Sequence, residues 1–176
     1  VTLVDANNNL VNADVNTTVT LSVKTGTGSL GGTISGTIIS GNSSVTITGV
    51  TYDKVETGVE LKATGTSAGS ANGKIGNSNA FAVSAGVGSK IKLSTLSNYV
   101  AGTTQTITAT LTDENDNTVL ATANGTITLS VKTGTGTISG TYTGIILAGT
   151  SSVTITGVVY NKAETGIVLR ATGTGA

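Results

Sequence analysis

The feature that most constrains the fold of this chain is an internal repeat. The octapeptide LSVKTGTG occurs at Leu21–Gly28 and returns unchanged at Leu129–Gly136, 108 positions later. An offset of 108 aligns residues 1–68 with 109–176 without a gap (176 − 108 = 68), and about 42 of the 68 pairs are identical. A period of this length matches a β-sandwich domain and is far longer than a solenoid repeat, so the chain predicts two copies of one domain.

The pattern of polar and apolar residues predicts an all-β fold. Val19, Leu21 and Val23 alternate with Thr, Ser and Lys, and the same alternation occurs over 44–48 and 106–112. Period-two alternation is typical of an antiparallel strand with one buried face. Clusters of Gly, Asn and Asp separate these segments at intervals of about ten residues, as in β-sandwiches. We therefore expect two tandem immunoglobulin-like antiparallel β-sandwiches.

The residues between the two copies set the predicted domain boundary. Residues 79–84 have the pattern of a closing strand, residues 89–94 that of an opening strand, and the uncharged 85–88 that of a linker. We predict domains at 1–86 and 87–176, the first without its opening strand and the second without its closing strand. Each would then expose an unpaired sheet edge.

Two explanations of these unpaired edges remain open at the level of sequence. The chain continues at both ends, or a strand from a neighbouring subunit completes each sheet by donor-strand complementation. The second alternative predicts a subunit of a fibre.

Composition excludes several classes of function. The nine basic residues balance nine acidic ones, and the chain has neither His nor Cys. Ser-His and Cys-His catalytic pairs and the usual zinc sites are therefore excluded. The sequence also lacks the cluster of basic residues that a nucleic-acid-binding protein normally shows. No apolar run approaches the roughly 20 residues of a membrane-spanning helix. We predict no enzymatic activity, catalytic residue or cofactor, and no nucleic-acid partner or membrane span.

Several segments resemble one known family. Residues 106–119 and 1–11 are similar to the "TVTVxDxNGNxV" signature of bacterial Ig-like repeats of the invasin type. Residues 151–172 resemble the "GxATFxGLxxxKAGTGYxLTAT" segment of these repeats, and 99–104 resemble their opening segment. The resemblance implies Ig-like domains in extracellular tandem arrays, as in adhesins, S-layers and fibres, and implies no enzyme. The chain departs from the family in lacking Pro and in having Asn8 and Asp116 where Gly is frequent; both residue types tolerate a left-handed backbone.

Two acidic loops are candidate Ca²⁺ sites. The first begins at Asp5, and the second carries Asp113, Asn115, Asp116 and Asn117. The spacing resembles the start of an EF-hand loop, but the Gly at position six and the Glu at position twelve are absent from both. The principal interpretation is a hairpin turn whose Asx side chains bind nearby backbone amides. The alternative is weak Ca²⁺ binding, chiefly by the second loop.

Three sequons predict N-glycosylation at Asn16, Asn42 and Asn124, in a host that glycosylates. Asn16 and Asn124 are equivalent in the repeat.

These observations favour a structural role. We expect a non-enzymatic extracellular or cell-surface module, part of a tandem-repeat surface protein or self-assembling filament, whose partners are neighbouring repeats or subunits. The alternative is an adhesin or a carbohydrate-binding module of a secreted protein, with glycans as partners. Sugar binding normally uses exposed aromatic rings, and the repeat-equivalent Tyr52 and Tyr160 are the candidates.

Overall fold

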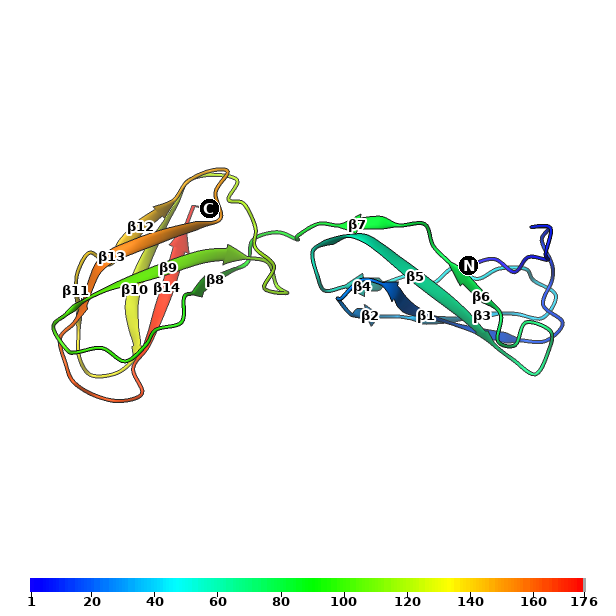
Figure 1. Cartoon of the computed structure of the whole chain (residues 1–176), viewed down its shortest axis with the longest axis horizontal. Coiled ribbons are helices and arrows are strands. Elements are labelled where there is room, and N and C mark those ends of the chain that lie inside the picture. The colour runs from blue at the N-terminus through cyan, green and yellow to red at the C-terminus, as the bar shows by residue number, and fades with distance from the viewer. Residues whose placement is uncertain (176) are drawn as a thin grey trace. The chain divides into compact units, whose positions relative to one another are not determined.

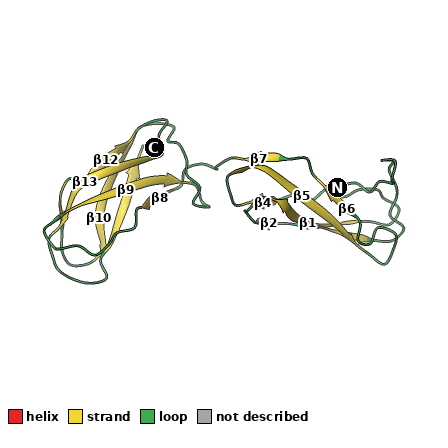
Figure 2. Ribbon diagram, in the orientation of Figure 1, coloured by secondary structure: helices red, strands yellow, loops and turns green. Residues whose placement is uncertain are grey.

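The protein is an all-β molecule made of two compact units. The computed structural model describes residues 1–175, and these residues form strands, turns and loops without a helix (Figure 2). The chain divides into Val1–Ser84, called unit 1, and Ala85–Ala176, called unit 2. Within the described residues, no helix is long and apolar enough to span a membrane.

Unit 1 is built around a five-stranded antiparallel sheet (Figure 1). Its strand order is β3-β1-β5-β6, and β7 also pairs with β5, while β2 and β4 form a separate two-stranded sheet. The strands of unit 1 are β1 (Thr17–Thr25), β2 (Leu30–Gly32), β3 (Ser35–Ile38), β4 (Val50–Tyr52), β5 (Glu56–Thr66), β6 (Ile75–Asn77) and β7 (Phe81–Val83).

Unit 2 has two antiparallel sheets, β12-β10-β14 and β11-β13-β9-β8. Its strands are β8 (Lys90–Leu93), β9 (Thr104–Thr112), β10 (Gly125–Thr133), β11 (Ile138–Gly140), β12 (Thr143–Ile146), β13 (Ser152–Tyr160) and β14 (Val168–Thr174). The opening and closing strands predicted at 89–94 and 79–84 correspond to β8 and β7.

Strand registers repeat between the units at the sequence offset of 108. Val19 lies opposite Gly36 and Gly65, and Ile127 lies opposite Gly144 and Gly173. A β-bulge interrupts the ladder between Val23 and Thr25 and again between Val131 and Thr133. The repeated sequence therefore forms the same strand in both units, β1 and β10, with a β-bulge at the same position.

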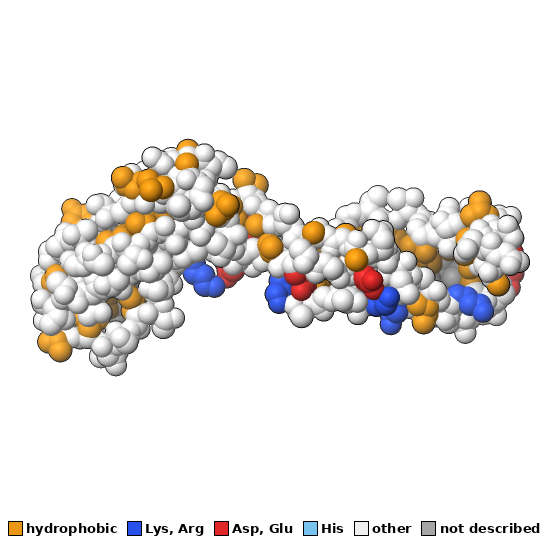
Figure 3. Space-filling view, turned by 45° about the horizontal axis from the view of Figure 1, so that its top comes forward, with side chains coloured by type: hydrophobic (Ala, Val, Ile, Leu, Met, Phe, Trp, Pro, Cys, Tyr) orange, Lys and Arg blue, Asp and Glu red, His pale blue; other side chains and the backbone are white. Residues whose placement is uncertain are grey.

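The aliphatic cores of the two units differ in size. Unit 2 buries nine hydrophobic residues in one cluster, among them Ile107, Ile127 and Ile155, and both Ile91 and Leu93 of β8 pack against it. The corresponding cluster of unit 1 contains Ala13, Val19 and Ile38. Other hydrophobic side chains reach the surface, where Figure 3 shows them scattered among polar ones.

One predicted strand is wrong in unit 1. The segment SSVTITGV forms part of β13 in unit 2, but its copy at Ser43–Val50 is irregular from residue 45 to 49 and becomes a strand only at β4. In unit 2, β13 pairs with β9 over Ser152–Val159. The half of β9 that pairs with this segment, Thr104–Thr108, corresponds by the offset of 108 to positions that precede Val1.

Candidate functional site

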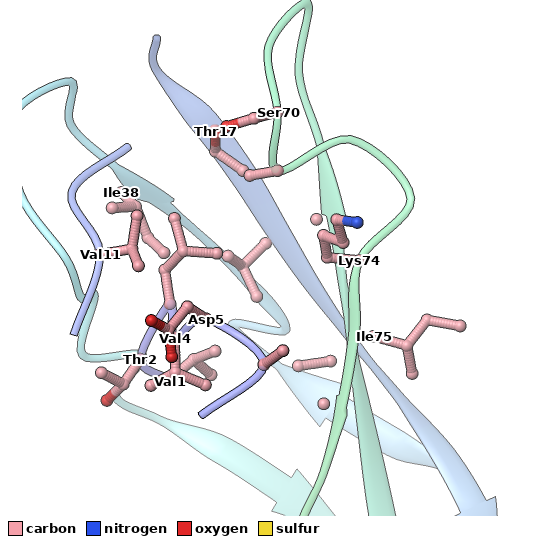
Figure 4. A pocket seen from close by; sticks show the side chains of 17 residues that line it. Val1, Thr2, Val4, Asp5, Val11, Thr17, Ile38, Ser70, Lys74 and Ile75 are labelled. Atoms are coloured by element: carbon pink, nitrogen blue, oxygen red, sulfur yellow. The ribbon is translucent and has the colours of Figure 1, made fainter. Parts of the chain in front are cut away.

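One candidate binding feature is an apolar groove of about 590 Å³ in unit 1. On one side lies the N-terminal segment with Val1, Leu3 and Val4; on the other lie β5 and the 70–76 segment (Figure 4). Val19 and Ile38 also line the groove. The lining thus joins the core cluster of unit 1 to the surface.

In unit 2, strand β8 occupies the position that corresponds to this groove. Ile91 of β8 lies opposite Leu111 in the β8–β9 ladder. A Cβ added to Gly173 would lie 3.6 Å from Ile91 Cδ1 and 3.3 Å from Ile127 Cδ1. Leu111, Ile127 and Gly173 are thus the neighbours of Ile91, and their counterparts 108 positions earlier, Leu3, Val19 and Gly65, all line the groove.

Part of the space above Gly65 is filled by the chain that follows β5. A Cβ added to Gly65 would lie 2.6 Å from the carbonyl oxygen of Ala71. The residue Ala71 is only 2% exposed. The groove is therefore bounded by the loop that carries Ala71 on this side and by the N-terminal segment on the other.

A second polar cluster lies where the repeated TGTG string meets a tyrosine and a glutamate. In unit 1, Glu56 Oε1 accepts hydrogen bonds from the Thr27 amide (2.8 Å), the Gly28 amide (3.0 Å) and the Tyr52 hydroxyl. In unit 2, Glu164 accepts the same bonds from Thr135, Gly136 and Tyr160.

These bonds hold both glutamates ionised. Mainly through the hydroxyl of Tyr52 or Tyr160, and then through the backbone amides, they lower the pKa of Glu56 and of Glu164 to about 2. Burial and the adjacent carboxylate raise the pKa of both tyrosines. In each unit the glutamate carboxylate binds the backbone amides of the TGTG loop, so its negative charge serves to hold that loop in place.

Two features of these loops require glycine: a tyrosine ring lies close to the backbone, and the backbone turns with a positive φ. A Cβ added to Gly28 would lie 2.6 Å from Tyr52 Cζ, and one added to Gly136 would lie 2.6 Å from Tyr160 Cζ. Gly26 and Gly134 each have a φ of 132°, a conformation that side chains disfavour. The recurrence of TGTG therefore reflects a tyrosine packed against the loop backbone.

The two acidic loops form Asx turns. Asp113, only 4% exposed, accepts hydrogen bonds from the amides of Gly86 (2.9 Å), Asn115 (3.0 Å) and Asn117 (2.9 Å). These bonds, that from Gly86 first, lower the pKa of Asp113. Asp116 has the left-handed φ of 65°, as Asn8 has in the first loop.

In the first loop the side chain of Asn9, followed by backbone amides, lowers the pKa of the exposed Asp5. No cluster of three or more His, Cys, Asp or Glu side chains suited to a metal occurs within residues 1–175. Ca²⁺ binding by Asp113, Asn115, Asp116 and Asn117 stays a prediction.

The three sequon asparagines are exposed. Asn16 Oδ1 accepts a hydrogen bond from the Ser40 amide (2.9 Å), and Asn124 Oδ1 accepts one from the Ala148 amide (2.8 Å). Both therefore fasten a neighbouring loop through the amide oxygen. Glycosylation of Asn16, Asn42 and Asn124 stays a prediction.

The sequence pattern predicted neither the groove nor the Tyr–Glu clusters. The signal for the clusters was present, since Tyr52, Glu56 and both glycines recur unchanged in the second copy. Comparison with known proteins adds no relative: no family model, no curated protein and no solved structure matches the chain.

Proposed function

We propose that the chain is a non-enzymatic structural module: two tandem Ig-like β-sandwiches of an extracellular tandem-repeat protein or self-assembling filament. The observation that carries this proposal is the duplication itself, because the two copies reproduce the same strand registers and the same Tyr–Glu loop anchors. A scaffold benefits from copies of one stable unit. The resemblance to invasin-type repeats supports the extracellular setting.

The polar clusters support a structural role. The carboxylates of Glu56, Glu164 and Asp113 each accept hydrogen bonds from their own unit's backbone. Charged residues are 10% of the chain and sum to zero net charge. Weak electrostatic repulsion favours association between neighbouring chains.

Electron microscopy of the purified protein over a range of concentrations tests this proposal. We expect rods or filaments that grow with concentration, and no dependence of assembly on added saccharide. A dispersed protein that binds defined glycans on an array would overturn the structural role in favour of the adhesin or carbohydrate-binding alternative. Burial disfavours that alternative at one of its candidate rings, because Tyr160 is only 1% exposed.

A further inference from the structure

The linker 85–88 is exposed to water and yet is fastened at one point. Its residues 86–88 are exposed, and Val87 is 88% exposed. Within the part of the chain that the structure describes, a single hydrogen bond holds the linker: the Gly86 amide donates to Asp113 Oδ2 (2.9 Å). A side chain of the second acidic loop thus holds a segment that belongs to no strand.

The carboxylate of Asp113 uses its two oxygens for two different contacts. Its Oδ1 accepts hydrogen bonds from the amides of Asn115 (3.0 Å) and Asn117 (2.9 Å), which form the Asx turn. Its Oδ2 accepts the Gly86 amide, and the Asn117 side chain donates to both oxygens (3.2 and 3.0 Å). Asp113 is only 4% exposed, so these bonds are shielded from water. The turn and the linker therefore depend on different oxygens of one buried side chain.

The linker backbone also packs against the end of β9. A Cβ added to Gly88 would lie 2.9 Å from Leu111 Cδ2, so the backbone at this position lies directly on that side chain. At the next position, the Ser89 amide donates to the Thr112 carbonyl (2.8 Å). The contacts of the chain with the body of unit 2 therefore begin in the linker, before strand β8 starts.

We infer that Asp113 is a linker clasp: its Oδ2 fixes the backbone of Gly86 and so orders the linker 85–88. The glycines on both sides of Val87 make the free linker flexible, because glycine loses more conformational freedom on ordering than other residues. The charge-assisted hydrogen bond to a shielded carboxylate compensates for this loss. The inference deepens the proposed structural function and rests on it, since a clasped linker shortens the free tether between neighbouring repeats.

Amide exchange in the unmodified chain is the first experiment. We expect the Gly86 amide to exchange at least tenfold more slowly than its intrinsic rate, because it donates to Asp113. The amides of Val87 and Gly88, which have no acceptor in the described chain, should exchange near their intrinsic rates. NMR measures each amide separately. A Gly86 amide that exchanges as freely as that of Val87 would overturn the inference.

The second experiment separates the linker from the turn. In Asp113→Asn the remaining carbonyl oxygen still accepts the turn amides of 115–117, whereas the NH₂ group that replaces Oδ2 cannot accept from Gly86. We expect at least tenfold faster exchange at Gly86 and lower heteronuclear NOE values over 85–88. We also expect at least tenfold faster cleavage after Val87 by a protease specific for small aliphatic residues. The turn amides should keep their exchange rates.

The first acidic loop supplies the matched control. Asp5 Oδ1 accepts the amides of Asn7 (2.8 Å) and Asn9 (2.9 Å) in the same turn, but among the described residues its Oδ2 accepts only the Asn9 side chain (3.0 Å). Asp5→Asn should therefore leave the exchange and cleavage of 85–88 unchanged. Equal linker mobility in the two variants would overturn the inference even if microscopy shows filaments. Glycan binding without assembly would instead remove the proposed function.

Discussion

The same eight residues, SSVTITGV, have different structures in the two units. In unit 2 the last seven of them, Ser152–Val158, form part of the nine-residue strand β13, which pairs with β9 on one side and with β11 near its end. In unit 1, Ser44 forms an isolated bridge with Thr2, residues 45–49 are irregular, and only Val50 belongs to a strand, β4. The two segments have the same sequence and therefore the same local preference for strand, but only one of them is a continuous strand. The pairing partner therefore decides whether this segment becomes a strand.

The partner also decides how deeply the side chains are buried. Ile155 is 1% exposed and Val158 is 2% exposed, whereas Ile47 and Val50 are half-buried. The Thr-rich outer face is exposed in both copies. The difference in exposure is therefore confined to the inward-facing side of the segment.

Hydrogen exchange should show the largest difference between the copies. The TITG segments at 46–49 and 154–157 have the same sequence and hence nearly the same intrinsic exchange rates. Because only the second is paired with β9, we expect it to exchange at least about a hundredfold more slowly. Mass spectrometry of peptides from each segment measures this. Equal rates would mean that the two copies are equally ordered.

Matched truncations should show the next largest effect. We expect Ile155→Ala to lower the free energy of unfolding of unit 2 by about 2–5 kcal/mol, because Ile155 is fully buried in the core cluster. Ile47→Ala should cost unit 1 about 1 kcal/mol or less, since that side chain is half-buried. Urea unfolding followed by NMR signals from each unit separates the two.

The exposed pair Thr48→Ala and Thr156→Ala is the control for these truncations. Each should change the unfolding free energy by less than about 0.5 kcal/mol. If Ile47→Ala costs as much as Ile155→Ala, the first copy is packed more tightly than its exposure indicates.

Sequence reasoning succeeded where a strand carries its own signal. The alternation at Val19, Leu21 and Val23 predicted β1, and the Asx-rich loops predicted turns in which Asn8 and Asp116 tolerate the left-handed backbone that they have. It failed at 45–49, because the determinant is a strand distant in sequence. The link between Tyr160 and Gly136 was missed for the same reason, since a hydrogen bond across 24 residues leaves no local pattern.

Removal of the tyrosine hydroxyls should have an intermediate effect. Tyr160→Phe removes the hydrogen bond that the buried Tyr160 hydroxyl donates to Glu164 Oε1, so we expect the Tm of unit 2 to fall by about 5–10 °C. Tyr52→Phe should lower the Tm of unit 1 by less, because Tyr52 is half-buried. Calorimetry with assignment of each transition by NMR measures both; a larger loss in unit 1 would contradict the comparison.

The pH dependence of stability should reveal the glutamates. Their folded pKa of about 2 lies below the ordinary value of 4.5, so their stabilisation is complete above about pH 5 and is lost as the pH falls toward 2. Several aspartates also titrate there, so the measurement is the difference between wild type and Glu164→Gln. We expect this difference in Tm to shrink by a few degrees between pH 5 and pH 2. A difference in Tm that does not change with pH would mean that the charge of Glu164 does not stabilise unit 2.

The smallest effect is expected at a surface position where the copies differ in charge. Lys24 forms an ion pair with Glu60 (2.7 Å), but the counterpart of Glu60 in unit 2 is Val168, opposite the bulge after Val131. Exposed ion pairs contribute little because water screens them, so Glu60→Val should lower the Tm of unit 1 by no more than about 2 °C. The reciprocal Val168→Glu should give Lys132 the same partner and raise the Tm of unit 2 by a similar amount at low salt. Both changes should vanish in 1 M salt, whereas a salt-independent loss from Glu60→Val would show that the Glu60 side chain stabilises unit 1 by packing and not by charge.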